Sequence, residues 1–240
     1  MLRKWYLLDL GMTNYRKAWA LQLRLVEERK ADVLKSDVVL LVEHPSVFTL
    51  GRRGGLANLK VSQVFLADRG IDVVHVERGG DITYHGPGQV VLYPVVNLRT
   101  MGLGVLPFVE SLEEIMIRTL ADWGIKGERN SINRGAWVGM KKIGSIGIAV
   151  RRSVSFHGLA LNVNTDLEPF TWVNPCGLHD VVITSMKQQL GTTISMEDVK
   201  QAAVRHMEDA FGVSLAALAI QEMEGTLGIQ PDQPTFGKMI

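Results

Sequence analysis

Apolar residues recur along this chain with two different spacings, and together the spacings predict an α/β protein. Alternating or continuous apolar runs of a few residues favour strands, whereas apolar residues at every third or fourth position favour helices. The predicted strands cover residues 5–10, 37–43, 47–50, 71–76, 90–98, 136–138, 142–151 and 154–163. The predicted helices cover residues 15–29, 62–70, 106–123 and 195–211.

Residues that cap helices stand at the ends of these helical patterns. Thr13 or Asn14 precedes the first helix, and Ser62 opens the second. Ser195 opens the last helix and is followed by an aspartate in the place that a capping box gives to glutamate. Gly124 follows the third helix, and glycine commonly ends a helix. The sequence therefore marks most of the helix boundaries.

The order of these elements predicts a mixed β-sheet flanked by helices. Strand runs follow one another directly between residues 136 and 163, with a candidate tight turn at Arg152-Ser153. Such neighbouring strands argue against a strictly alternating, doubly wound fold. We expect a single domain over residues 1–225 and a loosely held C-terminal tail over residues 226–240.

A glycine-rich stretch separates the predicted strands at 71–76 and 90–98. It reads Arg78-Gly-Gly-Asp-Ile-Thr-Tyr-His-Gly-Pro-Gly-Gln89. Glycines let the backbone approach a ligand closely, so we expect a ligand-binding loop here. The glycines lead into a strand and lack the Gly-x-Gly-x-x-Gly spacing of dinucleotide-binding proteins. The sequence also has no Gly-x-x-x-x-Gly-Lys-Ser/Thr phosphate loop.

Composition and charge narrow the class of protein. The 240 residues are 46% apolar and 21% charged, with a net charge of +1 and no lysine and arginine block of the kind that binds nucleic acid. No stretch reaches the roughly 20 apolar residues that span a bilayer, and the first apolar run is too short for a signal peptide. The single cysteine excludes an internal disulfide and a multi-cysteine zinc site. We expect a cytoplasmic protein whose partners include neither nucleic acid nor membrane.

That cysteine, Cys176, lies between a proline and a glycine in an irregular polar stretch. A lone cysteine is commonly a small buried apolar residue. A catalytic cysteine instead needs a nearby base or cation, because the thiolate is the reactive form and a free thiol has a pKa of about 8.5. The candidate partners are His85, His157, His179, Lys141 and Lys142. Sequence spacing alone does not choose among them.

Four motifs in the chain resemble those of the lipoyl(octanoyl) transferases, the LipB-type enzymes of protein lipoylation, and occur in the same order. They are the stretch from Arg78 to Gln89, Lys142-Ile-Gly-Ser-Ile-Gly147, His157-Gly-Leu-Ala-Leu-Asn-Val-Asn164 and Asn174-Pro-Cys-Gly177. The resemblance covers most of the chain, to about Met186. It implies the α/β fold of the biotin and lipoate protein ligase catalytic domains, with a mixed sheet.

The resemblance also implies an acyltransferase reaction. Enzymes of this family transfer an octanoyl or lipoyl group from acyl carrier protein to a lysine of a lipoyl domain, through a thioester on a cysteine. The acceptors are the lipoyl domains of 2-oxoacid dehydrogenase complexes and the H protein of glycine cleavage. We expect no metal, no cofactor and no ATP, because exchange between two thioesters is nearly balanced in free energy.

Position within these motifs assigns the site residues. Cys176 would carry the acyl group, and Lys142 would lower the pKa of the thiol and exchange protons. Backbone N–H groups of the glycines, Gly144 among them, could approach the thioester oxygen, and the apolar residues could form a slot for a C8 chain. The acyl pocket would comprise Arg78, Gly79, Gly80, Asp81, Ile82, Thr83, Tyr84, His85, Ser145, Ile146, Gly147, Gly158, Leu159 and Ala160.

Several polar residues also permit simpler roles. His85 could only hydrogen-bond within its loop, and Asp81 could order the loop through local backbone bonds. Arg78 could pair with Glu77 or Asp81, or could order the substrate. Arg52-Arg53 could be a solvated turn or could receive an acidic carrier protein.

Three other functions stay compatible with the sequence. An ATP-dependent lipoate–protein ligase would use the same scaffold to activate a free acid and would not need the cysteine. A thioesterase would release free octanoate. A non-catalytic module would only bind lipoyl domains or carrier proteins.

Overall fold

An eight-stranded mixed sheet forms the centre of the computed structural model, which describes residues 2–174, 181–219 and 222. Its strands are β1 (Arg3–Met12), β2 (Val38–Glu43), β6 (Gln89–Val95), β7 (Gly135–Val138), β8 (Lys141–Arg151), β9 (Val154–Asn162), β10 (Val182–Ile183) and β11 (Val213–Ala217). They lie in the order β10-β8-β9-β6-β2-β1-β11, and β7 also pairs with β8. The pairs β1–β2, β1–β11 and β8–β10 are parallel and the others antiparallel, which confirms the predicted mixed sheet.

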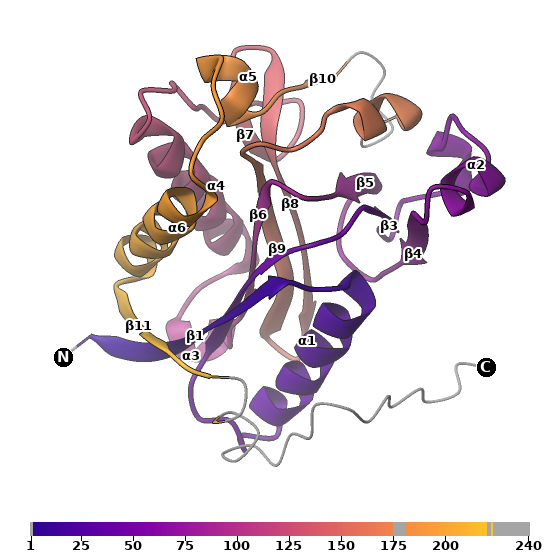
Figure 1. Ribbon diagram of the computed structural model, residues 1–240. Helices are drawn as coiled ribbons and strands as arrows, with labels where there is room; N and C mark the ends of the chain where they lie inside the picture. The colour runs from indigo at the N-terminus through magenta and orange to yellow at the C-terminus, as the bar shows by residue number, and fades with distance from the viewer. Residues whose placement is uncertain (1, 175–180, 220–221, 223–240) are drawn as a thin grey trace, which may run out of the picture.

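A second, three-stranded sheet lies beside the large one. It comprises β3 (Val47–Leu50), β4 (Asp72–His75) and β5 (Ile82–His85), in the order β4-β3-β5. The short helix α2 (Gln63–Ala67) and the 3-10 helices η1 (Leu56–Asn58) and η2 (Glu168–Trp172) lie at this end of the molecule (Figure 1). The small sheet packs its own apolar core, which includes Phe48 and Leu50 from β3 and Phe170 from η2.

Helices cover both faces of the large sheet. Helix α1 (Tyr15–Lys30) lies on one face, and α4 (Val105–Ala121) and α6 (Met196–Phe211) lie on the other (Figure 1). The short helices α3 (Leu98–Met101) and α5 (Met186–Leu190) complete the set. Within the described part of the chain, no helix combines the length and the apolar content that a membrane crossing requires.

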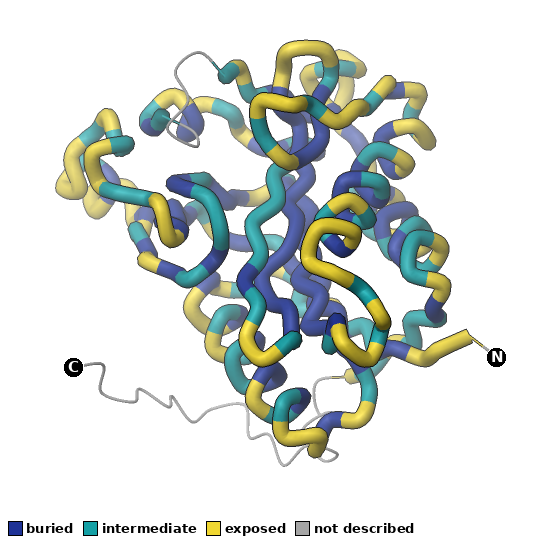
Figure 2. Tube along the Cα trace, turned by 180° about the vertical axis from the view of Figure 1, so that it is seen from behind, coloured by how far each residue is buried: buried dark blue, intermediate teal, exposed yellow. Residues whose placement is uncertain are grey.

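Strand β2 shows why the sequence has a continuous apolar run at residues 38–42. Successive side chains of a strand point to opposite faces of its sheet. Val38, Leu40 and Val42 enter the core beneath α1, whereas Val39 and Leu41 enter the core beneath α4 and α6. All five are buried, and Figure 2 shows buried residues concentrated along the central strands. A strand covered on both faces has no position left for a polar side chain.

The capping predictions are confirmed at three helices. Asn14, rather than Thr13, caps α1, because its side chain accepts a hydrogen bond of 2.9 Å from the N–H of Arg16. Ser62 and Ser195 cap α2 and α6 in the same way. The predicted turn at Arg152-Ser153 also forms between β8 and β9, with both residues at positive φ, as primed hairpin turns require.

The structure corrects the prediction for residues 78–98. The stretch from Arg78 to Gln89 is not a loop throughout, because Ile82–His85 forms β5 and pairs antiparallel with β3. The strand predicted to reach residue 98 ends at Val95, since Asn97 caps the short helix α3. Strands β10 and β11 and the helices α3 and α5 were not predicted. β10 has two residues, and α3 and α5 have four and five, too few to show a periodicity. The proposed tail at 226–240 lies outside the described residues.

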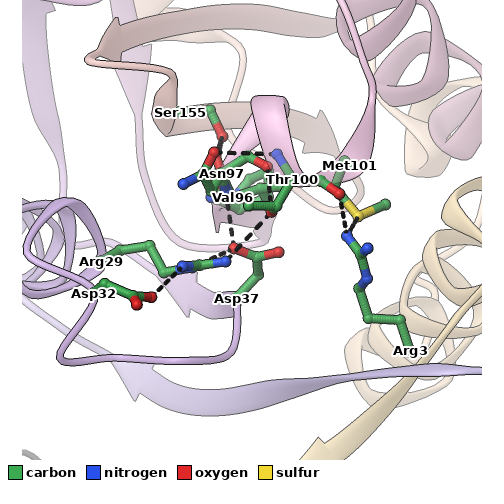
Figure 3. A network of polar contacts seen from close by, with 10 residues as sticks. Arg3, Arg29, Asp32, Asp37, Val96, Asn97, Thr100, Met101 and Ser155 are labelled. Carbon is green, nitrogen blue, oxygen red and sulfur yellow. Dashed lines mark hydrogen bonds and ion pairs between the residues drawn. The ribbon is translucent and has the colours of Figure 1, made fainter.

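A buried ion pair fastens α1 to the sheet (Figure 3). Arg29 and Asp37 are 6% and 2% exposed, and Arg29 Nε lies 2.8 Å from Asp37 Oδ1. The same carboxylate oxygen accepts a hydrogen bond of 2.9 Å from the N–H of Asn97, just after β6. Asp37 therefore joins the end of α1 to two neighbouring strands of the sheet.

Candidate active site

A cavity of about 700 Å³ opens between the large sheet and the small one. Three segments that are distant in sequence form its walls, namely residues 78–85, the strands β8 and β9, and the loop at residues 129–134. Lys142 and every residue predicted for the acyl pocket except Tyr84 line it. Cys176 and His179 lie outside the described residues.

Tyr84 is the one predicted pocket residue that the structure does not bring to the cavity. Side chains alternate along β5, and that of Tyr84 lies in the apolar core of the small sheet. The centre of its ring lies 5.3 Å from that of Phe48 and 5.4 Å from that of Phe170. Its hydroxyl lies 2.9 Å from the hydroxyl of Ser46. Ile82 belongs to the same apolar core, so its side chain also has a structural role. The orientation of both side chains is set by β5, a strand that the sequence did not predict.

The segment Arg78–Gly80 crosses over β8 and closes one side of the cavity. The N–H of Gly79 donates to the carbonyl of Ile148 at 2.8 Å, so this N–H is committed to the sheet and cannot serve a thioester oxygen as the sequence suggested. A Cβ at Gly147 would lie 3.0 Å from the carbonyl oxygen of Gly79. Glycine at position 147 is therefore required by the close approach of the two backbones.

Arg78 is buried and binds the small sheet. Its guanidinium donates from Nη2 to the carbonyl and the hydroxyl of Thr49, at 2.6 and 2.8 Å. Thr49 is a partner that the sequence did not suggest for this arginine. Asp81 accepts from the N–H of Ile82 at 2.7 Å and from the side chain of Asn58 at 2.6 Å, as its predicted loop-ordering role requires. Both charged residues thus shape the wall of the cavity.

A cluster of buried aromatic and imidazole side chains lies under the cavity. It comprises Tyr15, His44, His85, Tyr93 and His157. His44 Nε2 lies 2.8 Å from the hydroxyl of Tyr93, and His85 Nδ1 lies 2.7 Å from the side-chain oxygen of Gln89. Burial lowers the pKa of His44 from 6.5 to about 4 and that of His85 from 6.5 to about 3. Both imidazoles are therefore neutral at physiological pH.

These neutral imidazoles predict a loss of stability in mild acid. The unfolded chain binds protons on its histidines below about pH 6.5, while the folded chain takes none up on His44 or His85 until a much lower pH. The free energy of unfolding is therefore at its full value above pH 7 and decreases as the pH falls below 6.5. At pH 5.5 each histidine should cost roughly 1.4 kcal/mol of unfolding free energy. Urea unfolding at pH 7.5 and 5.5 measures the difference, and equal free energies at the two pH values would contradict it.

His157 marks an irregularity in the sheet beside the cavity. The ladder between β6 and β9 runs as far as Leu92 and Leu159, and Pro94 in β6 has no N–H with which to continue it. His157 adopts a φ of +56°, and its N–H donates instead to the side chain of Gln22 in α1 at 2.7 Å. Its Nε2 lies 3.6 Å from a carboxylate oxygen of Glu77. Pro94, a proline within an apolar strand, is the one feature of the sequence that signals this break.

The structure distinguishes Lys141 from Lys142, between which sequence spacing did not choose. Lys141 is exposed, whereas Lys142 is 3% exposed and lines the cavity. Its Nζ donates to the side-chain oxygen of Asn133 at 2.8 Å and lies 5.6 Å from the centre of the Trp137 ring. Lys142 is therefore a buried amine held at the wall of the cavity.

Several cavity residues were missed by the sequence analysis. Tyr15 lies within the apolar stripe of α1, and Tyr93 lies within an apolar strand, so each resembled a core residue. The loop at residues 129–134 gave no signal at all, because its polar sequence is that of an ordinary surface turn. Arg53, which the sequence left open between a solvated turn and a docking charge, is exposed and lines the cavity. Among the described residues, no group of three or more His, Cys, Asp or Glu is placed to hold a metal ion.

Comparisons of sequence relate the chain to enzymes of lipoylation. The lipoyl protein ligase A/B catalytic domain family matches residues 14–208. An octanoyltransferase of Desulfotalea psychrophila is 51% identical over 209 residues, which cover 86% of this chain and 94% of that protein. An octanoyltransferase of Syntrophobacter fumaroxidans is 49% identical over 227 residues, which cover 95% of this chain and 99% of that protein.

Comparisons of structure identify the fold. A lipoate–protein ligase A bound with ATP superposes with a TM-score of 0.74 at 18% identity, over 93% of this chain and 92% of that one. The bipartite lipoate protein ligase of Thermoplasma acidophilum, solved in a study that includes its E2 lipoyl domain, gives a TM-score of 0.71 at 17% identity, over 94% and 90%. At such identities the likeness is one of fold alone, and it confirms the predicted arrangement of a lipoate protein ligase catalytic domain.

Proposed function

This chain belongs to the lipoyl protein ligase A/B catalytic domain family and is an acyltransferase, and from that premise we propose that it transfers an octanoyl or lipoyl group from acyl carrier protein to a lysine of a lipoyl domain. The observation that carries the proposal is the gathering of three distant motifs around one cavity with the buried Lys142 in its wall. The octanoyltransferase relatives support the nature of the acyl group. Cytoplasmic location stays a prediction from composition.

We assign Cys176 as the residue that carries the acyl group. Support comes from the path of the chain on either side of it. The described chain stops at Asn174 and resumes at residue 181, shortly before β10, where Ile183 pairs directly with Lys142 in β8. The described residues that follow Cys176 in the chain thus pair beside the buried lysine, and an ammonium group near the cysteine would favour its thiolate form.

The proposed reaction has two steps. The Cys176 thiolate attacks the thioester carbonyl of the donor, and the phosphopantetheine thiolate leaves. The amine of the incoming lysine then attacks the new thioester, an amide forms, and the Cys176 thiolate departs. Lys142 stabilises the thiolate as an ammonium and gives its proton to the departing phosphopantetheine thiolate. The neutral amine that results takes the proton that the incoming amine loses, so Lys142 returns to the ammonium form. The activated thioester supplies the driving force, so we propose that no ATP or metal takes part.

The carrier protein would approach at the cavity opening. Arg53 is exposed there, and the N–H groups of Arg52 and Arg53 donate to the carbonyls of Arg78 and Gly80 at 2.9 and 3.1 Å. These bonds tie the basic loop to the cavity wall. An exposed positive charge on this loop suits an acidic carrier protein, because complementary charge steers association.

Intact-mass spectrometry with peptide mapping tests the function directly. The protein is exposed briefly to octanoyl acyl carrier protein without an acceptor, and an octanoyl adduct is expected on Cys176. Adding a lipoyl domain should discharge the adduct and acylate the domain's lysine. The Cys176→Ser variant should give no discharging adduct. Turnover without any adduct, or exchange of pyrophosphate into ATP in the presence of octanoate, would contradict the acyl-enzyme and favour a ligase.

A further inference from the structure

The loop at residues 129–134 lines the cavity, and its Asn133 is hydrogen-bonded to Lys142. The side-chain oxygen of Asn133 accepts from Lys142 Nζ at 2.8 Å. Lysine nitrogen donates hydrogen bonds when protonated, so an amide oxygen is the matching group. The contact joins a residue without any assigned role to the proposed proton-transfer group.

The backbone around Asn133 is fixed, so its side chain can hold another group in place. The carbonyl of Asn133 accepts from the indole N–H of Trp137 at 3.0 Å. The next two residues, Arg134 and Gly135, both donate to the carboxylate of Glu113 in α4, at 3.1 and 3.0 Å. Glu113 is 1% exposed, so the loop is anchored to the interior of the molecule.

Lys142 is held from two sides as a result. Trp137 stands opposite Lys142 in the pairing of β7 with β8, and its ring faces the ammonium at 5.6 Å. Asn133 supplies the hydrogen bond. A lysine side chain has four rotatable bonds and about 2 kcal/mol of rotamer entropy to lose, so a free ammonium would spread over several positions. The two contacts hold the Lys142 amine in one of these positions.

The neutrality of Asn133 also matters for the chemistry. A carboxylate at this position would form an ion pair with Lys142 and favour its charged form. An amide oxygen accepts the same hydrogen bond without adding a negative charge, so the lysine can still give up its proton. We propose that Asn133 is a positioning residue for Lys142, which directs the amine into the cavity and leaves it able to titrate. This inference rests on the proposed function, because it assumes that Lys142 exchanges protons during acyl transfer.

The test compares variants of Asn133 in the transfer of octanoyl groups to a lipoyl domain. Asn133→Leu keeps the size of the side chain and removes the acceptor, so kcat should fall roughly 10- to 100-fold, less than the roughly 10²- to 10⁴-fold contribution of an acid–base group itself, while KM for the lipoyl domain stays constant. Asn133→Gln keeps the amide and should recover part of the rate. Asn133→Asp should fold normally and move the acidic limb of the pH–kcat profile to higher pH by about one unit, because the carboxylate stabilises the ammonium.

A matched control separates this local effect from a change in overall charge. Lys141→Met lowers the net charge by one, as Asn133→Asp does, but Lys141 is exposed and does not line the cavity. Its pH profile should match that of the parent protein. An unchanged profile for Asn133→Asp, or a kcat for Asn133→Leu equal to that of the parent, would overturn the inference. A parent protein that transfers no octanoyl group, or a fully active Lys142→Met variant, would instead overturn the proposed function.

Discussion

Replacing Lys142 with methionine is expected to lower kcat for octanoyl transfer roughly 10²- to 10⁴-fold, the range in which a positioned acid–base group contributes. Methionine matches lysine in length and fills the buried site, but it holds no proton. Lys142 lines the cavity and is 3% exposed, so bulk water does not readily replace it. Loading of Cys176 should slow as well, because the thiolate loses its cation. Stopped-flow mass spectrometry of both half-reactions measures the two effects separately.

Lys141→Met serves as the control for this loss. The two lysines are neighbours in β8 and point to opposite faces of the strand, so only Lys142 meets the cavity. The control variant should keep nearly the full rate. Equal losses in the two variants would show that general positive charge, rather than Lys142, supports the reaction.

The largest effect on stability is expected for Asp37→Asn. Arg29 and Asp37 are both buried, and their closest atoms are 2.8 Å apart. Removing the charge of Asp37 leaves the charge of Arg29 buried without its closest partner, which typically lowers the free energy of unfolding by about 3–5 kcal/mol. The N–H of Asn97 also loses its charged acceptor. Urea unfolding at neutral pH should show a correspondingly lower midpoint, since most globular domains have only about 5–15 kcal/mol of stability in total.

Asp32→Asn provides the matched comparison. Asp32 also faces Arg29, at 3.8 Å, but its side chain is 67% exposed. Asparagine tolerates the positive φ of 58° that this position adopts. Solvent screens an exposed pair, so this variant should unfold close to the parent midpoint. Similar losses in the two variants would mean that burial does not decide the strength of this network.

The features of the fold that depend on neighbouring residues could be predicted from the sequence. The apolar run of β2 reflects burial on both faces, and Asn14, Ser62 and Ser195 satisfy the free N–H groups at the start of their helices. These features depend on a few adjacent residues. They could therefore be predicted without any knowledge of the tertiary structure.

What sequence reasoning missed depends on contacts between distant segments. β5 forms because β3 offers it an edge, and that pairing decides which way Tyr84 points. Asn133 faces Lys142 only because Glu113 draws the loop against α4. Nothing in the residues around Asn133 distinguishes it from a solvent-exposed turn. Within the motifs the sequence could name the pocket residues, but it could not name the groups that hold them in position.

The pairing of β11 with β1 also bears on how this protein is made. β1 can pair with β2 soon after synthesis begins, but its other edge, from Arg3 to Leu7, pairs within the described residues with 213–217. Until those residues leave the ribosome, the nascent chain carries an open strand edge able to recruit other chains. The elements that build the cavity precede β11 in the sequence. Pairing of β11 with β1, rather than assembly of the cavity, thus removes this open edge from the newly made protein.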